Sequence, residues 1–259
     1  HGGWSLGGFA GAGVLLVLLK ILSLPVNQSI WGLLIVLFIA MVVVSQFMLT
    51  FGSDPNAKVT KKSKSPLSFH PIALIFGLLS FVSYLVEGAV GDWSALYLFE
   101  DKGILIEEAV MGVMLFNGTM CIGRLLGNRL GKHLTSKQVV VGGYLLGSIA
   151  MGLIVFLPGH ASMYTYLLLG ISLAMIVPNL FSAMGEQNVI PMTQAVATST
   201  MLGYMGILMG PALIGFIAHG TSLTVAFIVL TTLLVVSAGI GKYAYHLMSK
   251  DCGLSEEQI

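Results

Sequence analysis

Charge is what this chain has least of. Lys, Arg, Asp and Glu make up 9% of its 259 residues, whereas a soluble domain carries about 25%. So few charged side chains cannot cover a surface that faces water, and a mean hydropathy of +0.93 excludes an ordinary soluble protein. Cysteine is also scarce, because Cys121 and Cys252 are too few for a disulfide framework or a metal cluster.

The usual marks of chemistry are missing as well. The sequence has no phosphate-binding loop, no nucleophile triad and no metal-ligand spacing. This argues against an ATP-driven pump and against an enzyme, so we expect no catalytic residue, no bound metal, no cofactor and no nucleic-acid partner. Five histidines lie near the ends of apolar segments or between them, which gives no buried proton relay: His70, His133, His160, His219 and His246.

What the chain does contain is eight apolar runs long enough to cross a bilayer. A helix rises about 1.5 Å per residue through a hydrocarbon core of about 30 Å. None of the runs alternates apolar and polar residues as a membrane barrel would. We therefore predict an all-α polytopic membrane protein with eight transmembrane helices, at Trp4 to Leu24, Ile30 to Thr50, Pro71 to Phe99, Ala109 to Leu126, Val139 to Leu157, Met163 to Ala183, Ala195 to His219 and Leu223 to Tyr243.

The basic residues gather on one side of this topology. Lys20 and Lys102 fall on one side, beside four carboxylates, and the other ten Lys and Arg fall on the opposite side. Cytoplasmic connections of membrane proteins carry the excess of Lys and Arg. The basic connection from Gly52 to Phe69 and the C-terminal tail are therefore predicted to be cytoplasmic. The ten are Lys58, Lys61, Lys62, Lys64, Arg124, Arg129, Lys132, Lys137, Lys242 and Lys250.

One connection on that side carries a motif. It reads Gly123-Arg124-Leu125-Leu126-Gly127-Asn128-Arg129-Leu130-Gly131-Lys132. Gly131 allows a tight turn, and Arg129 and Lys132 can pair with a carboxylate or a helix C-terminus. The segment resembles the loop signature of the major facilitator superfamily, roughly G-x-x-x-D-R-x-G-R-R, with Asn128 in place of the usual Asp. The resemblance implies a cytoplasmic gating motif of Gly123, Arg124, Asn128, Arg129, Gly131 and Lys132; the alternative is a plain basic loop.

The resemblance also implies a numbering. If the motif follows helix 8, the eight segments are helices 5 to 12 of a twelve-helix transporter. Residues 1–51 then hold the last two helices of the N-terminal bundle, 52–69 the basic central loop, 70–250 the C-terminal six-helix bundle and 251–259 the cytoplasmic tail. His1 is not a Met and the first helix begins almost at once, so we expect a chain that lacks its N-terminal part.

Two further stretches support the resemblance. Glu87 to Ser94 and Gly203 to Pro211 look like a bacterial, sugar-transporter-like subgroup of unknown substrate, which implies a multi-pass protein of the bacterial inner membrane. Glycines four residues apart let helix backbones pack closely. Such stripes are Gly3, Gly7 and Gly11; Gly123, Gly127 and Gly131; and Gly206 and Gly210.

Glu87 is the strongest candidate site residue. It lies about 3 Å from the midplane of its segment, and Asp92 lies about 10 Å from it. A carboxylate at that depth is costly and seldom without a role. Glu87 could bind a proton or a polar solute group, or it could pair with a Ser, Asn or Tyr donor on a neighbouring helix. Tyr84 and Ser94 share its helix face, and Asp92 could equally serve as a gate or in helix packing.

Asn117, Asn179 and Tyr204 also place polar groups at membrane depth, where each could touch the solute or form an interhelical hydrogen bond. We predict a secondary active transporter of a small polar solute, with sugar-like solutes favoured, that works by alternating access with proton coupling through Glu87. The alternatives are a multidrug or metabolite efflux antiporter and a non-transporting membrane receptor or scaffold. The expected partners are the solute, the lipid bilayer and protons, and the expected state is a monomer.

Overall fold

The computed structural model describes residues 2–47, 67–130 and 134–252, and in these ranges every regular element is a helix. The predicted basic loop up to residue 66 and the tail from residue 253 lie outside the described residues. The helices are α1 (Gly2–Leu16), the π-helical turn η1 (Val17–Ile21), α2 (Val26–Ser45), α3 (Pro71–Glu100), α4 (Ile106–Leu130), α5 (Ser136–Phe156), α6 (Gly159–Tyr164), α7 (Tyr166–Leu173), α8 (Ile176–Glu186), α9 (Met192–Gly220) and α10 (Leu223–Cys252).

The length and apolar character of these helices confirm the predicted polytopic all-α membrane fold. Seven helical spans in the described part are long and apolar enough to cross a membrane, and a shorter apolar helix covers Leu6–Ile21. Local chemistry sets several ends: Pro25 is the N-cap of α2, and Pro71 takes the first position of α3, where its missing N–H has no helical partner to lose. The last helix runs to Cys252, well beyond the expected Tyr243.

The sixth predicted segment differs from the sequence prediction. Residues Gly159–Glu186 form one membrane-length unit, but it is divided into α6, α7 and α8 rather than being one straight helix. The break before α8 has a clear cause in Pro178. A proline has no N–H to donate to the carbonyl four residues earlier, here that of Ala174, which ends α7.

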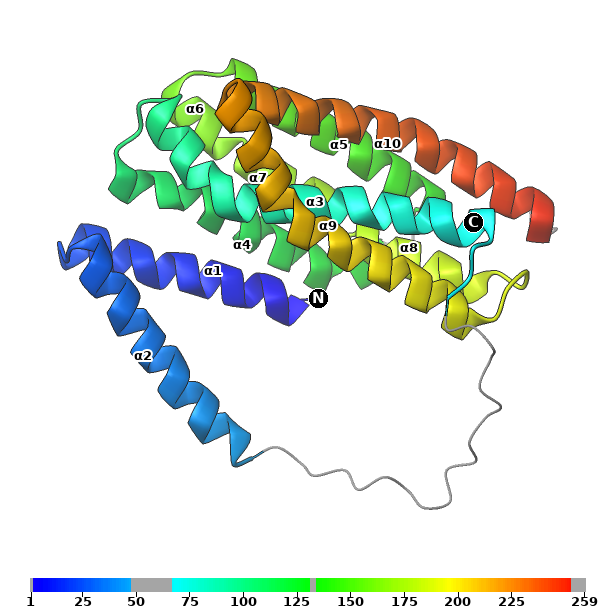
Figure 1. Cartoon of the computed structure of the whole chain (residues 1–259), viewed down its shortest axis with the longest axis horizontal. Helices are drawn as coiled ribbons and strands as arrows, with labels where there is room; N and C mark the ends of the chain where they lie inside the picture. Colours follow the sequence, from blue (N-terminus) through cyan, green and yellow to red (C-terminus); the bar gives the residue numbers. More distant parts are fainter. Residues whose placement is uncertain (1, 48–66, 131–133, 253–259) are drawn as a thin grey trace.

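The bundle is built around α3, most of whose side chains are buried. Helix α9 crosses α3 at close range, as Figure 1 shows, and the glycines of α9 explain the approach. A Cβ atom added at Gly210 would lie 2.8 Å from the carbonyl oxygen of Leu85, and one at Gly206 would overlap the carbonyl oxygen of Phe81. The close packing predicted for this glycine pair is therefore present.

The glycine stripe of α1 behaves differently from the prediction. A Cβ atom added at Gly3, Gly7 or Gly11 would meet nothing within 4 Å, so these positions do not hold helices together. Helix α1 lies along α4 through Gly8 instead, where an added Cβ would be 2.6 Å from Oδ1 of Asn117. Helix α2 leaves the bundle at an angle (Figure 1), and Ser29 is its single buried residue.

The motif segment also differs from the expected loop. Helix α4 continues to Leu130, so the residues from Gly123 onward are helical, whereas the sequence analysis ended this helix at Leu126. Glycine does not interrupt the helix here because Gly123 is a packing position. A Cβ there would lie 2.6 Å from the side chain of Ala174.

Candidate functional site

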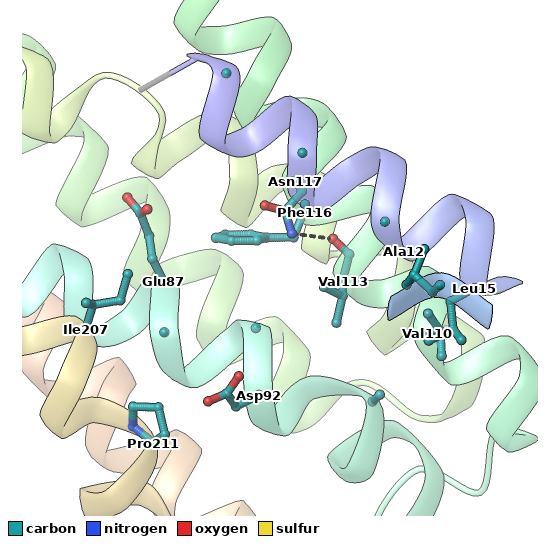
Figure 2. A pocket seen from close by; sticks show the side chains of 18 residues that line it. Ala12, Leu15, Glu87, Asp92, Val110, Val113, Phe116, Asn117, Ile207 and Pro211 are labelled. Atoms are coloured by element: carbon teal, nitrogen blue, oxygen red, sulfur yellow. Dashed lines mark hydrogen bonds between the residues drawn. The ribbon is translucent and has the colours of Figure 1, made fainter. Parts of the chain in front are cut away.

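A cavity of about 770 Å³ lies between α1, α3, α4 and α9, with Leu33 of α2 at its edge. Figure 2 looks into it and shows Glu87 and Asp92 on α3 and Asn117 on α4. The side from α1 is made mainly of Gly3, Gly7, Gly8 and Gly11. Because glycine carries no side chain, the stripe that leaves α1 without close neighbours creates the volume of the cavity.

Glu87 lies in the wall of this cavity and forms a buried ion pair. Its Oε1 is 2.9 Å from Nη2 of Arg124, and the two side chains are 5% and 3% exposed. A single buried charge is very costly, and a paired and hydrogen-bonded one is tolerated. The pair therefore explains how a carboxylate is accommodated at this depth of the membrane.

A second acceptor holds Arg124 in place. Its Nε donates to the carbonyl oxygen of Ala174 at 3.3 Å. That carbonyl is the one that Pro178 leaves without a helical donor. The guanidinium from α4 is thus fixed between a carboxylate on α3 and a backbone acceptor at the break between α7 and α8.

Both members of this pair were candidate site residues in the sequence, but their contact was not predicted. Arg124 was expected at the cytoplasmic end of its helix, in a segment that resembles a loop signature, and the structural alternative for Glu87 was a Ser, Asn or Tyr donor. The structure instead pairs Glu87 with Arg124. A usable signal was present, because an intramembrane carboxylate calls for a cation. Asn128 and Arg129 lie in α4 but their side chains are not among those described, and Gly131 and Lys132 lie outside the described residues. The gating motif as a whole therefore stays a prediction.

Asp92 is the second carboxylate of the cavity. Its side chain is exposed and forms no hydrogen bond or ion pair with any residue that the structure describes. Its neighbour Trp93 is engaged, with Nε1 donating to the carbonyl oxygen of Pro211 at 3.0 Å. Asn117 also lines the cavity, and its Nδ2 donates to the carbonyl oxygen of Val113 at 3.0 Å.

Tyr84 and Tyr204 form a second group, one helical turn before the cavity. Their rings stack with centroids 5.7 Å apart and planes 12° apart. They border a separate hollow of about 460 Å³ with Phe181 and Thr200. On α3, Tyr84 precedes Glu87 by three residues, about 4.5 Å along the axis. The stack therefore lies next to the ion pair but outside the main cavity.

Ser94 and Asn179 are not brought to the cavity. Ser94 is fully buried, and its hydroxyl donates to the carbonyl oxygen of Val90 in its own helix. Asn179 donates in the same way to the carbonyl oxygen of Met175 at 2.8 Å. Both polar groups satisfy themselves locally, as short polar side chains in helices often do.

The end of the bundle at which α3 stops and α4 begins carries another charge cluster. Nζ of Lys20, in η1, lies 2.6 Å from Oε1 of Glu108 in α4, and Nε2 of His160 in α6 lies 3.0 Å from Oε2. Lys102 donates to the carbonyl oxygen of Val155 at 2.6 Å. Burial lowers the pKa of the Lys102 ammonium, and the carboxylate of Asp101 opposes this shift. The contact of Lys20 joins η1, which continues α1, to α4 at this end of the bundle, and the other contacts connect α4 with α6 and the α3–α4 turn with α5.

No family model matches the chain. The chain is 36% identical over 243 residues to an uncharacterized MFS-type transporter of Yersinia pestis, in an alignment that covers 92% of the chain and 61% of that protein. It is 30% identical over 170 residues to the membrane protein MosC of Rhizobium meliloti, covering 64% of the chain and 42% of that protein. The chain thus spans less than two thirds of the length of these relatives.

Solved structures give the same fold. A crystal structure of the E. coli fucose:proton symporter FucP superposes with a TM-score of 0.62 at 16% identity, covering 85% of the chain and 56% of the symporter. A second FucP structure, described as an MFS transporter in the outward conformation, gives 0.61 at 14% identity. At such identities the likeness concerns the fold alone.

Proposed function

We propose that this chain, which belongs to the major facilitator superfamily, supplies helices 5 to 12 of a secondary transporter that moves a small polar solute by alternating access. One observation supports this more than any other: a cavity of about 770 Å³ with two carboxylates between α1, α3, α4 and α9. In our assignment, residues 1–51 belong to the first bundle and residues 70–250 to the second. The cavity then lies at the boundary between the two bundles, where such transporters bind their solutes.

Proton coupling is assigned to Glu87. The carboxylate faces the cavity, and among the described residues Arg124 balances its charge. A proton that reaches Glu87 removes that charge and weakens the ion pair between α3 and α4, while Ala174 still holds the guanidinium. A buried charge pair between two packed helices is a suitable two-state element for a switch.

A sugar-like solute and a proton are the first pair to test, because FucP, which has the same fold, is a fucose:proton symporter. Seven apolar spans and the distribution of Lys and Arg support a multi-pass protein of the bacterial inner membrane with its C-terminus in the cytoplasm. We propose that the transporter works as a monomer.

The test uses the full-length protein in proteoliposomes with an imposed pH gradient and radiolabelled monosaccharides. Glu87→Gln should lose accumulation driven by the gradient and keep downhill exchange, because the amide preserves shape but cannot take up the proton. Asp101→Asn is the matched control, since it removes an exposed carboxylate outside the cavity. Undiminished pH-driven accumulation in Glu87→Gln would refute the coupling role. A wild-type protein that moves no solute would favour a receptor or scaffold.

A further inference from the structure

The charges on the cavity wall are unequal in sign. Glu87 and Asp92 are its charged residues, and no Lys, Arg or His is among the described residues that line it. Glu87 is already neutralised by Arg124, whose side chain is buried on the other side of the pair. Asp92 has no such partner among the described residues. The cavity therefore contains one uncompensated negative charge.

Among the described polar groups of the cavity wall, hydrogen-bond acceptors are more available than donors. Two nearby side-chain donors are already engaged: one N–H of Asn117 Nδ2 donates to the carbonyl of Val113, and Nε1 of Trp93 donates to that of Pro211. The acceptors that remain include the Asp92 carboxylate and Oδ1 of Asn117, which come from different helices (Figure 2).

The carbonyl oxygen of Ile207 is a third acceptor on the same wall, and Pro211 leaves it without its helical donor. As a proline inside α9 it cannot donate to the carbonyl of Ile207, four residues earlier. That carbonyl faces α3, because a Cβ added at Gly88 would lie 3.1 Å from its oxygen. Ile207, Pro211 and Gly88 all line the cavity. A backbone acceptor without its helical donor thus lies beside the Glu87 turn.

We propose that this cavity binds a solute that donates hydrogen bonds and carries no negative charge, with Asp92 as its principal acceptor. Neutral polyols and singly charged amines share this chemistry. Hydrogen bonds from such donors to a carboxylate are among the strong ones, whereas an anion would meet repulsion from Asp92, and the described residues of the wall include no cation to offset it. The inference deepens the proposed transport function and depends on it, because only a transporter would carry the bound molecule as a solute. The electrostatic preference of the cavity can nevertheless be measured without any transport.

The measurement uses a cysteine as a reporter inside the cavity. Ala12 of α1 lines it (Figure 2), so Ala12→Cys is introduced into full-length protein in which Cys121 and Cys252 are replaced by Ala. Its reaction rates with a cationic trimethylammonium methanethiosulfonate and an anionic sulfonate methanethiosulfonate are compared with those of a free thiol. We expect the cationic reagent to be favoured about tenfold, given one carboxylate in the same partly desolvated cavity.

Asp92→Asn should bring this preference close to that of the free thiol, because it removes the charge and keeps the shape. Glu100→Gln is the matched control, since it removes a carboxylate from the exposed end of the same helix, about 12 Å further along the axis. An equal or greater preference for the anionic reagent, or a preference that Asp92→Asn leaves unchanged, would overturn the proposal.

A second measurement distinguishes the two kinds of solute and separates this inference from the transport proposal. Uptake of glucose, glucosamine and glucuronate into proteoliposomes compares a neutral, a cationic and an anionic form of one ring. Uptake of glucose or glucosamine above glucuronate supports the inference and tells which donor is preferred, and faster uptake of glucuronate overturns it while leaving transport established. If none of the three is moved, transport of these sugars fails, and the thiol rates alone decide the polarity of the cavity.

Discussion

The ion pair between Glu87 and Arg124 makes a quantitative prediction about stability. Nη2 of Arg124 lies 2.9 Å from Oε1 of Glu87, and neither side chain is more than 5% exposed. Removing one partner of such a pair leaves the other charge buried alone, which costs about 3–5 kcal/mol. Replacing both by uncharged side chains of similar size is often close to neutral. Glu87→Gln and Arg124→Met should therefore each be strongly destabilising, and the double variant should be much closer to the wild type.

The thermal midpoint offers a direct readout. For a domain of this size about 1 kcal/mol corresponds to about 2–4 °C, so each single variant should lose roughly 6–20 °C. The buried thiol of Cys121 is a natural reporter, because it becomes reactive toward a fluorogenic maleimide when the protein unfolds. The measurement uses detergent-purified full-length protein in which every cysteine except Cys121, Cys252 included, is replaced by Ser, so that only Cys121 gives a signal.

The double-mutant cycle decides the outcome. A coupling energy of several kcal/mol between the two positions is expected for residues in direct contact. Glu100→Gln should melt with the wild type, since that carboxylate is exposed. Single variants as stable as the wild type, or a double variant that loses the sum of the two single losses, would show that the two charges do not depend on each other.

Three other predictions concern packing, the charge cluster and orientation. Gly206→Ala should lose about 1–3 kcal/mol in the same melting assay because its Cβ would overlap Phe81, whereas Gly239→Ala, which has open space, should gain up to about 1 kcal/mol; equal effects would contradict the close crossing of α3 and α9. Lys20→Met should cost less than about 1 kcal/mol, because this lysine is 46% exposed, and a larger loss would show that the cluster supports the fold. Alkaline phosphatase fused after Lys250 should be inactive and green fluorescent protein there should fluoresce; active phosphatase would reverse the orientation.

Much of the fold could be predicted because apolar length alone dictates it. Each of the eight predicted segments overlaps one helical unit of the structure, seven of them long enough to cross a membrane. Glu87 was identified from its depth in its segment as the costly carboxylate, with Asp92 nearer the interface. The close crossing at Gly206 and Gly210 followed from their spacing, since both neighbours on the same helix face must be small for backbones to meet.

The remaining features depend on where helices lie in three dimensions. The same four-residue spacing at Gly7 and Gly11 lines a cavity instead of a helix contact, because no other helix packs closely against these two glycines. The partner of Glu87 was hidden because Arg124 belongs to a motif that reads as a loop, and the helix continues through it. The periodicity of a sequence predicts on which face of its helix a residue lies, but it does not predict which other helix packs against that face.

The break before α8 has a consequence for how variation in this protein should be understood. Pro178 leaves the carbonyl oxygen of Ala174 without a helical donor, and this oxygen accepts a hydrogen bond from Nε of Arg124. A residue able to donate its own N–H at position 178 would compete with the guanidinium for Ala174. Such a change would add a hydrogen bond within α8 and weaken the one from Nε of Arg124, while leaving the contact of Nη2 with Glu87. The missing N–H of Pro178 therefore helps to fix where the charge of Arg124, on α4, is held.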